Sequence, residues 1–130
     1  PSGAAAEVAG AVQPLRLKPV SPLALYQLLR IASIRASKAA GRTIAFEADA
    51  SPASSALIAD ASLIVSEAIV RLSQSPGGQP QLSKIGKVVV VEGARPSVVL
   101  KNNVLLIVVA PDQGLSGRPS SERIIQVAFR

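Results

Sequence analysis

The chain has 130 residues, a formal net charge of +6 and 48% apolar residues, with only one Tyr and two Phe. This length suits one domain with one aliphatic core, and the aromatic residues are too few for a row of base-stacking side chains. Because the chain contains no Cys and no His, it has no disulfide, no Cys/His zinc site, no Ser–His–Asp or Cys–His nucleophile and no phospho-accepting His.

Residues 1–20 are rich in Ala and contain two prolines, which is typical of a linker or lead-in rather than of a core. A helix is expected to follow, because Ser21 can cap it, Pro22 suits its first turn and Gly41 can end it. Apolar residues recur at helical spacing within it, at Leu25, Leu29, Ala32 and Ala36. We therefore divide the chain into a lead-in and a folded domain, residues 21–130.

Residues 43–48 alternate in the manner of a strand with one buried side. The apolar piece 56–59 then leads to Asp60, which can cap a second helix that ends near Ser75. The apolar residues on one side of this helix are Ile64, Val65, Ala68, Ile69 and Leu72. Residues 73–83 are rich in Pro, Gly, Gln and Ser, which predicts a mobile loop or a lid beside a site.

Three β-rich runs follow, at residues 87–91, 98–100 and 104–109, and the short turns between them favour an antiparallel meander or hairpin. The third run continues to Ala110 without a polar residue, which is typical of a strand buried on both faces. Residues 124–129 fit a strand or a helical turn equally well. The order of elements predicts an α+β fold, a two-layer α/β sandwich with helices on one face of a mixed, largely antiparallel sheet.

The segment after the third run, PDQGLSG, is where we expect chemistry. Pro111 ends the hydrogen-bond ladder, so Asp112 emerges at the strand end. Gly114 and Gly117 allow the backbone to approach a ligand closely or to take a positive φ. We expect Asp112 to face a cavity between the sheet end and residues 73–83, an arrangement that suits a nucleotide. The alternative is a polar turn after a core strand, without a ligand.

Taken in order, these elements resemble the ATP-binding (GHKL) domain of sensor histidine kinases, whose relatives include anti-sigma-factor kinases, gyrase, heat-shock chaperones and mismatch-repair ATPases. The resemblance spans residues 15–130. SALIADASLIVSEAIVRL is similar to the segment that bears the family's Asn box, VVAPDQGLSG resembles its Asp-x-Gly-x-Gly box, and SSERIIQVAFR is similar to a later segment with a Phe near an Arg.

The resemblance implies that Asp112 accepts a hydrogen bond from the adenine amino group, that Gly114 lets the ring approach, and that Glu67 orients water in hydrolytic members. It implies ATP or ADP as the cofactor. The match is incomplete, because Gly117 stands one position later than the second glycine of the family's box. Arg71 stands where the family has a metal-ligating Asn, and a cation repels a metal, so Mg²⁺ is not expected.

The spacing of Glu67 and Arg71 also fits an exposed helix ion pair, which contributes about 0.2–0.5 kcal/mol. If Arg71 points toward a nucleotide instead, its guanidinium can hold a phosphate without a metal. The candidate site therefore consists of Glu67 as the one catalytic candidate and of four nucleotide-binding candidates: Asp112, Gly114, Gly117 and Arg71.

Together these features favour a degenerate ATP-binding domain that acts in signalling or as a protein-interaction module, with weak or no nucleotide binding and no catalysis on its own. One alternative is an active ATP-binding domain of a sensor histidine kinase. The other is a small basic structural subunit of an RNA- or protein-rich assembly.

We expect a protein partner, and an oligomer is compatible with the sequence. Nucleic acid is not expected, because Lys and Arg are scattered singly rather than gathered in a dense run. The sequence contains no run of roughly 18 uncharged apolar residues and no secretory signal, so we expect no membrane span. A location in the cytoplasm, a plastid or a mitochondrion is favoured over secretion.

Overall fold

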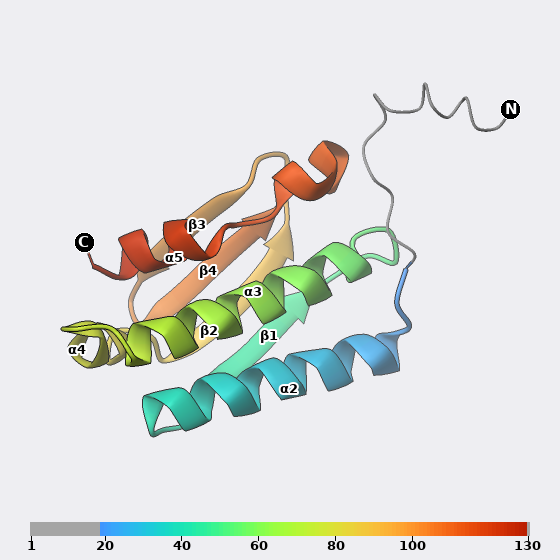
Figure 1. Ribbon diagram of the computed structural model, residues 1–130. Helices are drawn as coiled ribbons and strands as arrows, with labels where there is room; N and C mark the ends of the chain where they lie inside the picture. The colour runs from blue at the N-terminus through green and yellow to red at the C-terminus, as the bar shows by residue number, and fades with distance from the viewer. Residues whose placement is uncertain (1–18, 130) are drawn as a thin grey trace, which may run out of the picture.

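The structure is a computed structural model that describes residues 19–129 (Figure 1). The predicted lead-in, residues 1–20, lies almost wholly outside the described residues. In chain order the elements are α2 (Pro22–Ala40), β1 (Ala45–Asp49), α3 (Ser55–Ser73), α4 (Gly78–Leu82), β2 (Lys87–Glu92), β3 (Ser97–Lys101), β4 (Val104–Val109), the 3₁₀ segment η2 (Pro111–Gly117) and α5 (Ser121–Ala128).

The strands form one four-stranded sheet in the order β1-β2-β4-β3. The helices α2, α3 and α5 lie on the same face of this sheet (Figure 1). This confirms the predicted α+β sandwich with helices on one face of a mixed sheet. The expectation of a largely antiparallel sheet is wrong, because β1 pairs with β2 and β2 with β4 in parallel, and only β3 and β4 form an antiparallel pair.

The helix α2 begins and ends at the predicted residues. The Ser21 hydroxyl accepts a hydrogen bond from the Ala24 N–H at 3.1 Å, and Pro22 occupies the first turn. Gly41 ends the helix in the left-handed conformation, with φ at 75°. Residues that have a Cβ rarely adopt this conformation. The local chemistry of the sequence therefore sets both ends of this helix.

The N-cap of α3 is Ser54 and the helix begins at Ser55, six residues earlier than a cap at Asp60 implies, so the prediction of Asp60 as its cap is wrong. Residues 56–59 continue the helix, and Leu57, Ile58 and Ala59 add to its buried surface. Asp60 instead forms an ion pair with Arg118 beside η2.

The core lies between α3 and the sheet. Side chains on β2 and β4 alternate between buried and half-buried along each strand, and the buried set faces the helices. The largest fully buried side chains are Ile44, Ile58, Ile69, Leu72, Leu82, Ile85, Leu105, Ile107, Ile124, Val65, Val88 and Val90. The core is therefore aliphatic, as the composition predicts.

Residues 73–83 contain α4 and lie at the end of the sheet opposite to η2 (Figure 1). Gly78 packs against the backbone of Leu72 in the last turn of α3, whereas η2 is tied to the first half of α3 through the ion pair of Arg118 with Asp60. Since α3 has 19 residues, and such a helix is about 28 Å long, the two segments are widely separated. The expectation that residues 73–83 form a lid beside Asp112 is wrong.

The last apolar segment, residues 124–129, is mostly helical. By sequence alone it fits a strand or a helical turn. α5 begins after Ser120, whose hydroxyl accepts a hydrogen bond from the Arg123 N–H at 3.1 Å, and it packs on α3 and β3. In the described part of the chain, no helix is long and apolar enough to cross a membrane.

We predict that the buried face of α3 determines stability. Replacing the fully buried Ile69 by Ala should lower the free energy of unfolding by about 2–5 kcal/mol, because the lost side chain leaves a cavity. The same change at Ile34, which is 57% exposed on α2, should alter it by less than about 0.5 kcal/mol. Urea unfolding followed by circular dichroism measures both, and equal effects would contradict this account of the core.

Candidate functional site

The segment η2 follows β4 directly and contains two glycines, Gly114 and Gly117. The Ala110 N–H donates a hydrogen bond to the Gly117 carbonyl at 2.8 Å, which closes the turn. A Cβ on Gly117 would lie 1.9 Å from the Ala110 carbonyl oxygen. Gly114 interrupts the 3₁₀ segment with φ at 60° and ψ at −137°. Both glycines are buried, so the close packing of the turn itself requires them.

Asp112 lies on the outer side of this turn and is exposed to solvent. The expectation that it faces a cavity beside residues 73–83 is wrong, because that segment lies at the other end of the sheet. The 3₁₀ turn that begins at Pro111 points the carboxylate away from the core. Asp112 therefore has the position of a polar residue in a turn, which is the alternative that the sequence left open.

Glu67 and Arg71 do not pair with each other, although their spacing permits it. Glu67 accepts a hydrogen bond from the Arg35 guanidinium of α2 at 3.1 Å, and Arg71 donates to Glu122 of α5 at 3.4 Å. All four side chains are about half exposed or more, and such ion pairs contribute about 0–1 kcal/mol. Each pair joins α3 to a neighbouring helix on the solvent side.

The candidate residues are therefore not brought together. Asp60 is the residue of α3 that pairs with Arg118 at the end of η2. Measured along the helix axis from Asp60, Glu67 lies about 10 Å away and Arg71 about 16 Å away. Their side chains point to α2 and α5, while Asp112 points to solvent. Within residues 19–129, no three His, Cys, Asp or Glu side chains gather into a group able to hold a metal ion.

The sequence reasoning missed the ion pair between Arg118 and Asp60, in which each side chain is 35% exposed. The pair links the end of η2 to α3 across the edge of the core. One signal for it was present, because Asp60 interrupts the apolar run from 56 to 61 and a charged residue in such a run needs a partner.

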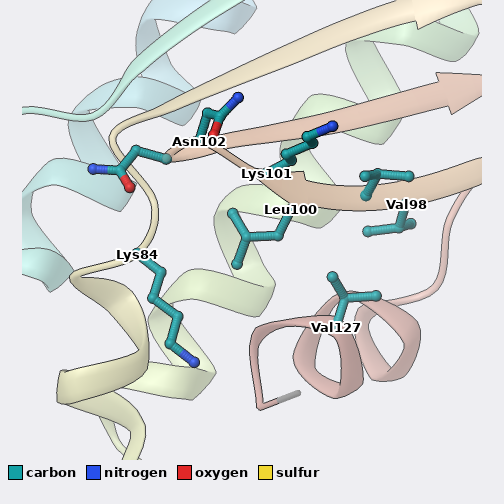
Figure 2. Close-up of a pocket in the computed structure, with 8 residues that line it drawn as sticks. Lys84, Val98, Leu100, Lys101, Asn102 and Val127 are labelled. Carbon is teal, nitrogen blue, oxygen red and sulfur yellow. The ribbon is translucent and has the colours of Figure 1, made fainter.

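An open pocket of about 450 Å³ lies near the turn between β3 and β4 (Figure 2). Its lining residues are Lys84, Val98, Val99, Leu100, Lys101, Asn102, Asn103 and Val127. The Lys84 ammonium donates to the Ala128 carbonyl at 3.4 Å, and Lys101 points away from the hollow in Figure 2. The lining contains two lysines and no carboxylate.

One face of the sheet points away from the helices, and its residues on β2 and β4 are half-buried. We call it the outer sheet face. Its residues form three rows across β1, β2, β4 and β3: Ala45, Lys87, Val104 and Lys101, then Glu47, Val89, Leu106 and Val99, then Asp49, Val91, Val108 and Ser97. On β2 and β4 every one of these residues except Lys87 is aliphatic. Among residues 19–129, no helix packs on this face (Figure 1).

Other large apolar side chains are exposed elsewhere, but they are interrupted by polar ones. On α2 they are Leu23, Tyr26, Ile31 and Ile34, which are 47–66% exposed. Gln27, Arg30 and Lys38 lie on the same side of the helix at exposed positions, so they divide this surface into two pairs, Leu23 with Tyr26 and Ile31 with Ile34. Scattered exposed apolar residues are common on soluble proteins, whereas a continuous apolar patch marks an interaction surface.

A family model described as Domain of unknown function (DUF4908) matches residues 1–128. The chain belongs to this family. No curated protein and no solved structure matches the chain at a significant level. The function of this DUF4908 chain is therefore inferred from its own sequence and geometry.

We predict that the turn of the DUF4908 chain does not tolerate a side chain at Gly117. Gly117→Ala should lower the free energy of unfolding by about 1–3 kcal/mol, because its Cβ would overlap the Ala110 carbonyl. Ser116→Ala is the control, since Ser116 is exposed and the change removes only its exposed hydrogen bond to the Gln113 carbonyl. A stability of Gly117→Ala equal to that of the control, measured by urea unfolding, would show that the turn opens freely.

We also predict that stability depends on the ionisation of Glu122. A hydrogen bond from its own backbone N–H, and then one from Arg71, hold the pKa of this carboxyl below its ordinary value of 4.5. Since the folded-state pKa is the lower one, the stabilisation is complete above pH 4.5 and is lost as the pH falls through the folded-state pKa.

The measurement is the thermal unfolding midpoint of the wild type, Glu122→Gln and Arg71→Gln between neutral and acidic pH. Glu122→Gln should remove this part of the acid dependence. Arg71→Gln should reduce it without abolishing it, because the backbone hydrogen bond remains. Identical pH profiles of the wild type and Glu122→Gln would refute the assignment.

Proposed function

We propose that this chain is a protein-interaction module built on a degenerate domain of the histidine-kinase ATPase type, without catalytic activity of its own. The proposed relation to the histidine-kinase ATPase type rests on the order of helix, strand, helix and strands and on the PDQG segment that follows the last strand. The interaction role rests on one observation, the aliphatic outer sheet face over β2 and β4.

The two strands at the centre of that face form a parallel pair. All-parallel sheets occur almost only where both faces are covered, and their strands are then apolar on both sides. This sheet is mixed, so the comparison applies to its central parallel pair alone. β2 and β4 have such sequences, with Val89, Val91, Leu106 and Val108 on the outer side. A sheet that faced water permanently would be expected to alternate with polar residues there. This pattern supports the proposal that another surface covers the outer sheet face.

Several features argue against nucleotide chemistry. Asp112 is exposed, and both glycines of η2 are used by the turn itself. Arg71 occupies the position where the resemblance places a metal ligand, and it is paired with Glu122 on the solvent side. Phosphoryl transfer depends on metal ions and positioned cations that neutralise the transferred group, so this arrangement does not suit it.

We predict that the full chain binds neither ATP nor ADP at about millimolar concentration, which corresponds to a free energy weaker than about −4 kcal/mol. Calorimetric titration with and without Mg²⁺, with Asp112→Ala as the matched variant, tests this. The active-ATPase alternative makes the opposite prediction, namely saturable binding that Asp112→Ala weakens by about 1.5–3 kcal/mol and phosphate release that Glu67→Ala abolishes.

The interaction role is tested by placing the photoreactive amino acid p-benzoylphenylalanine at Val99, which is 45% exposed at the rim of the outer sheet face. The control position is Gln126, which is exposed on α5. Irradiation of cells that express each full-length variant should give a discrete protein adduct from position 99 and none from position 126. Equal labelling from both positions, or none from either, would remove the basis of the proposal.

A further inference from the structure

We infer that the open edge of β3 binds an extended acidic segment of another protein, which pairs with β3 as a further strand of the sheet. β3 is the last strand in the order β1-β2-β4-β3, so among residues 19–129 only its β4 side is paired. This surface is the edge of the sheet and not the outer sheet face, and the inference does not depend on what covers that face.

The turn between β3 and β4 fixes which backbone groups of β3 lie at the open edge. Asn102 and Asn103 both have positive φ, at 54° and 65°, which is typical of a two-residue hairpin turn whose flanking residues exchange both hydrogen bonds. Lys101 therefore bonds to β4, and so does every second residue before it. Val98 and Leu100 lie between these residues, so their N–H and C=O groups point away from β4.

The other side of β4 gives an independent check of this alternation. The Lys87 N–H donates to the Asn103 carbonyl at 3.2 Å, and the Gly93 N–H donates to the Val109 carbonyl at 2.8 Å. The odd-numbered residues from 103 to 109 thus face β2, which leaves the even-numbered ones to face β3. Within residues 19–129, no loop or turn supplies a backbone hydrogen-bond partner at the open edge of β3.

A hollow lies beside these backbone groups. The pocket of about 450 Å³ is lined by the consecutive residues 98–103, with Lys84 and Val127 on its other side. Since successive side chains of a strand point to opposite faces, a hollow that touches all of them follows the edge of the strand. Figure 2 shows Val127 of α5 facing β3 across this hollow. An added strand therefore has room for its side chains between β3 and α5.

The side chains of β3 indicate what the added strand should carry. Lys101 is exposed, and no acidic side chain of residues 19–129 forms an ion pair with it. In an antiparallel strand, the residue opposite Lys101 belongs to a non-hydrogen-bonded pair, in which the two side chains are closest, so an acid there gains a cross-strand ion pair. Residues opposite Leu100 and Val98 point toward the hollow and should be apolar.

Two other occupants fit this edge less well. A compact ligand would fill the hollow without pairing the row of backbone groups beside it. A second copy of β3, paired antiparallel about Val99, would place Lys101 opposite Ser97 and supply no acid, and each copy carries a net charge of +6. Lysine on an edge strand hinders such self-pairing. An acidic segment satisfies both the backbone groups and the cation, as in recognition by strand addition.

The probe is the end-capped peptide SEVTVTS, which places its Glu opposite Lys101 and its two Val opposite Leu100 and Val98. Titration up to about 5 mM into the isotopically labelled full chain, followed by NMR, should shift the amide signals of β3 and of the end of α5. It should also slow the solvent exchange of the Leu100 amide. Absence of shifts, or shifts centred on β2 or α2, would overturn the inference.

Modified peptides test the strand pairing without altering the protein. N-Methylation of the two Val residues removes the N–H groups that face β3, and it should abolish binding. N-Methylation of the Thr between them is the matched control and should leave binding in place, because that N–H points away from β3. Equal affinities of the two methylated peptides would show that the peptide does not pair with β3 as a strand.

A charge exchange tests the preference for an acidic segment. Lys101→Glu should weaken the binding of SEVTVTS by about threefold or more, and this variant should prefer the peptide SKVTVTS. Lys38→Glu makes the same charge change at an exposed position of α2 and should leave both affinities unchanged. Equal binding of the two peptides to the wild type, or equal losses in the two variants, would refute the acidic preference. Self-association of the free chain through the same β3 amides would assign the edge to a second copy instead.

Discussion

The rest of the fold depends on the burial of α3 between α2, α5 and the sheet. Its inner side is fully excluded from solvent, and small residues at Ala61, Ser62, Ser66 and Ala68 let the neighbouring elements approach. The Ser66 hydroxyl donates to the Ala32 carbonyl of α2 at 2.9 Å, so even the polar groups on this side are satisfied within the protein.

This burial also decides where the charged residues of α3 lie. When Ala68, Ile69 and Leu72 face the sheet, the helical repeat directs Glu67 and Arg71 to the solvent side. There they meet a cation of α2 and an anion of α5, respectively. A site between α3 and the sheet cannot include them without rotating the helix and exposing its core residues.

Much of the secondary structure could be predicted from local chemistry, because Ser21 and Pro22 act in the first turn of α2 and Gly41 acts at its last turn. The strand order could not be predicted, since the runs that become β2, β3 and β4 fit a meander as well as they fit the observed arrangement. The crossover through α3 makes β1 parallel to β2, and β4 lies between β2 and β3, parallel to the first and antiparallel to the second. The direction of Asp112 depends on the 3₁₀ turn after Pro111, which the sequence pattern does not specify.

The position of Tyr26 has a spectroscopic consequence. It is the one tyrosine of a chain that has no tryptophan, and it is 61% exposed on α2. Intrinsic ultraviolet emission therefore originates on the helical side of the sheet, at a side chain already in water, and it should change little when the core melts or when the far side of the sheet is occupied. A large change in that emission would report an event on α2 itself, which makes the chain a selective optical probe of a single helix.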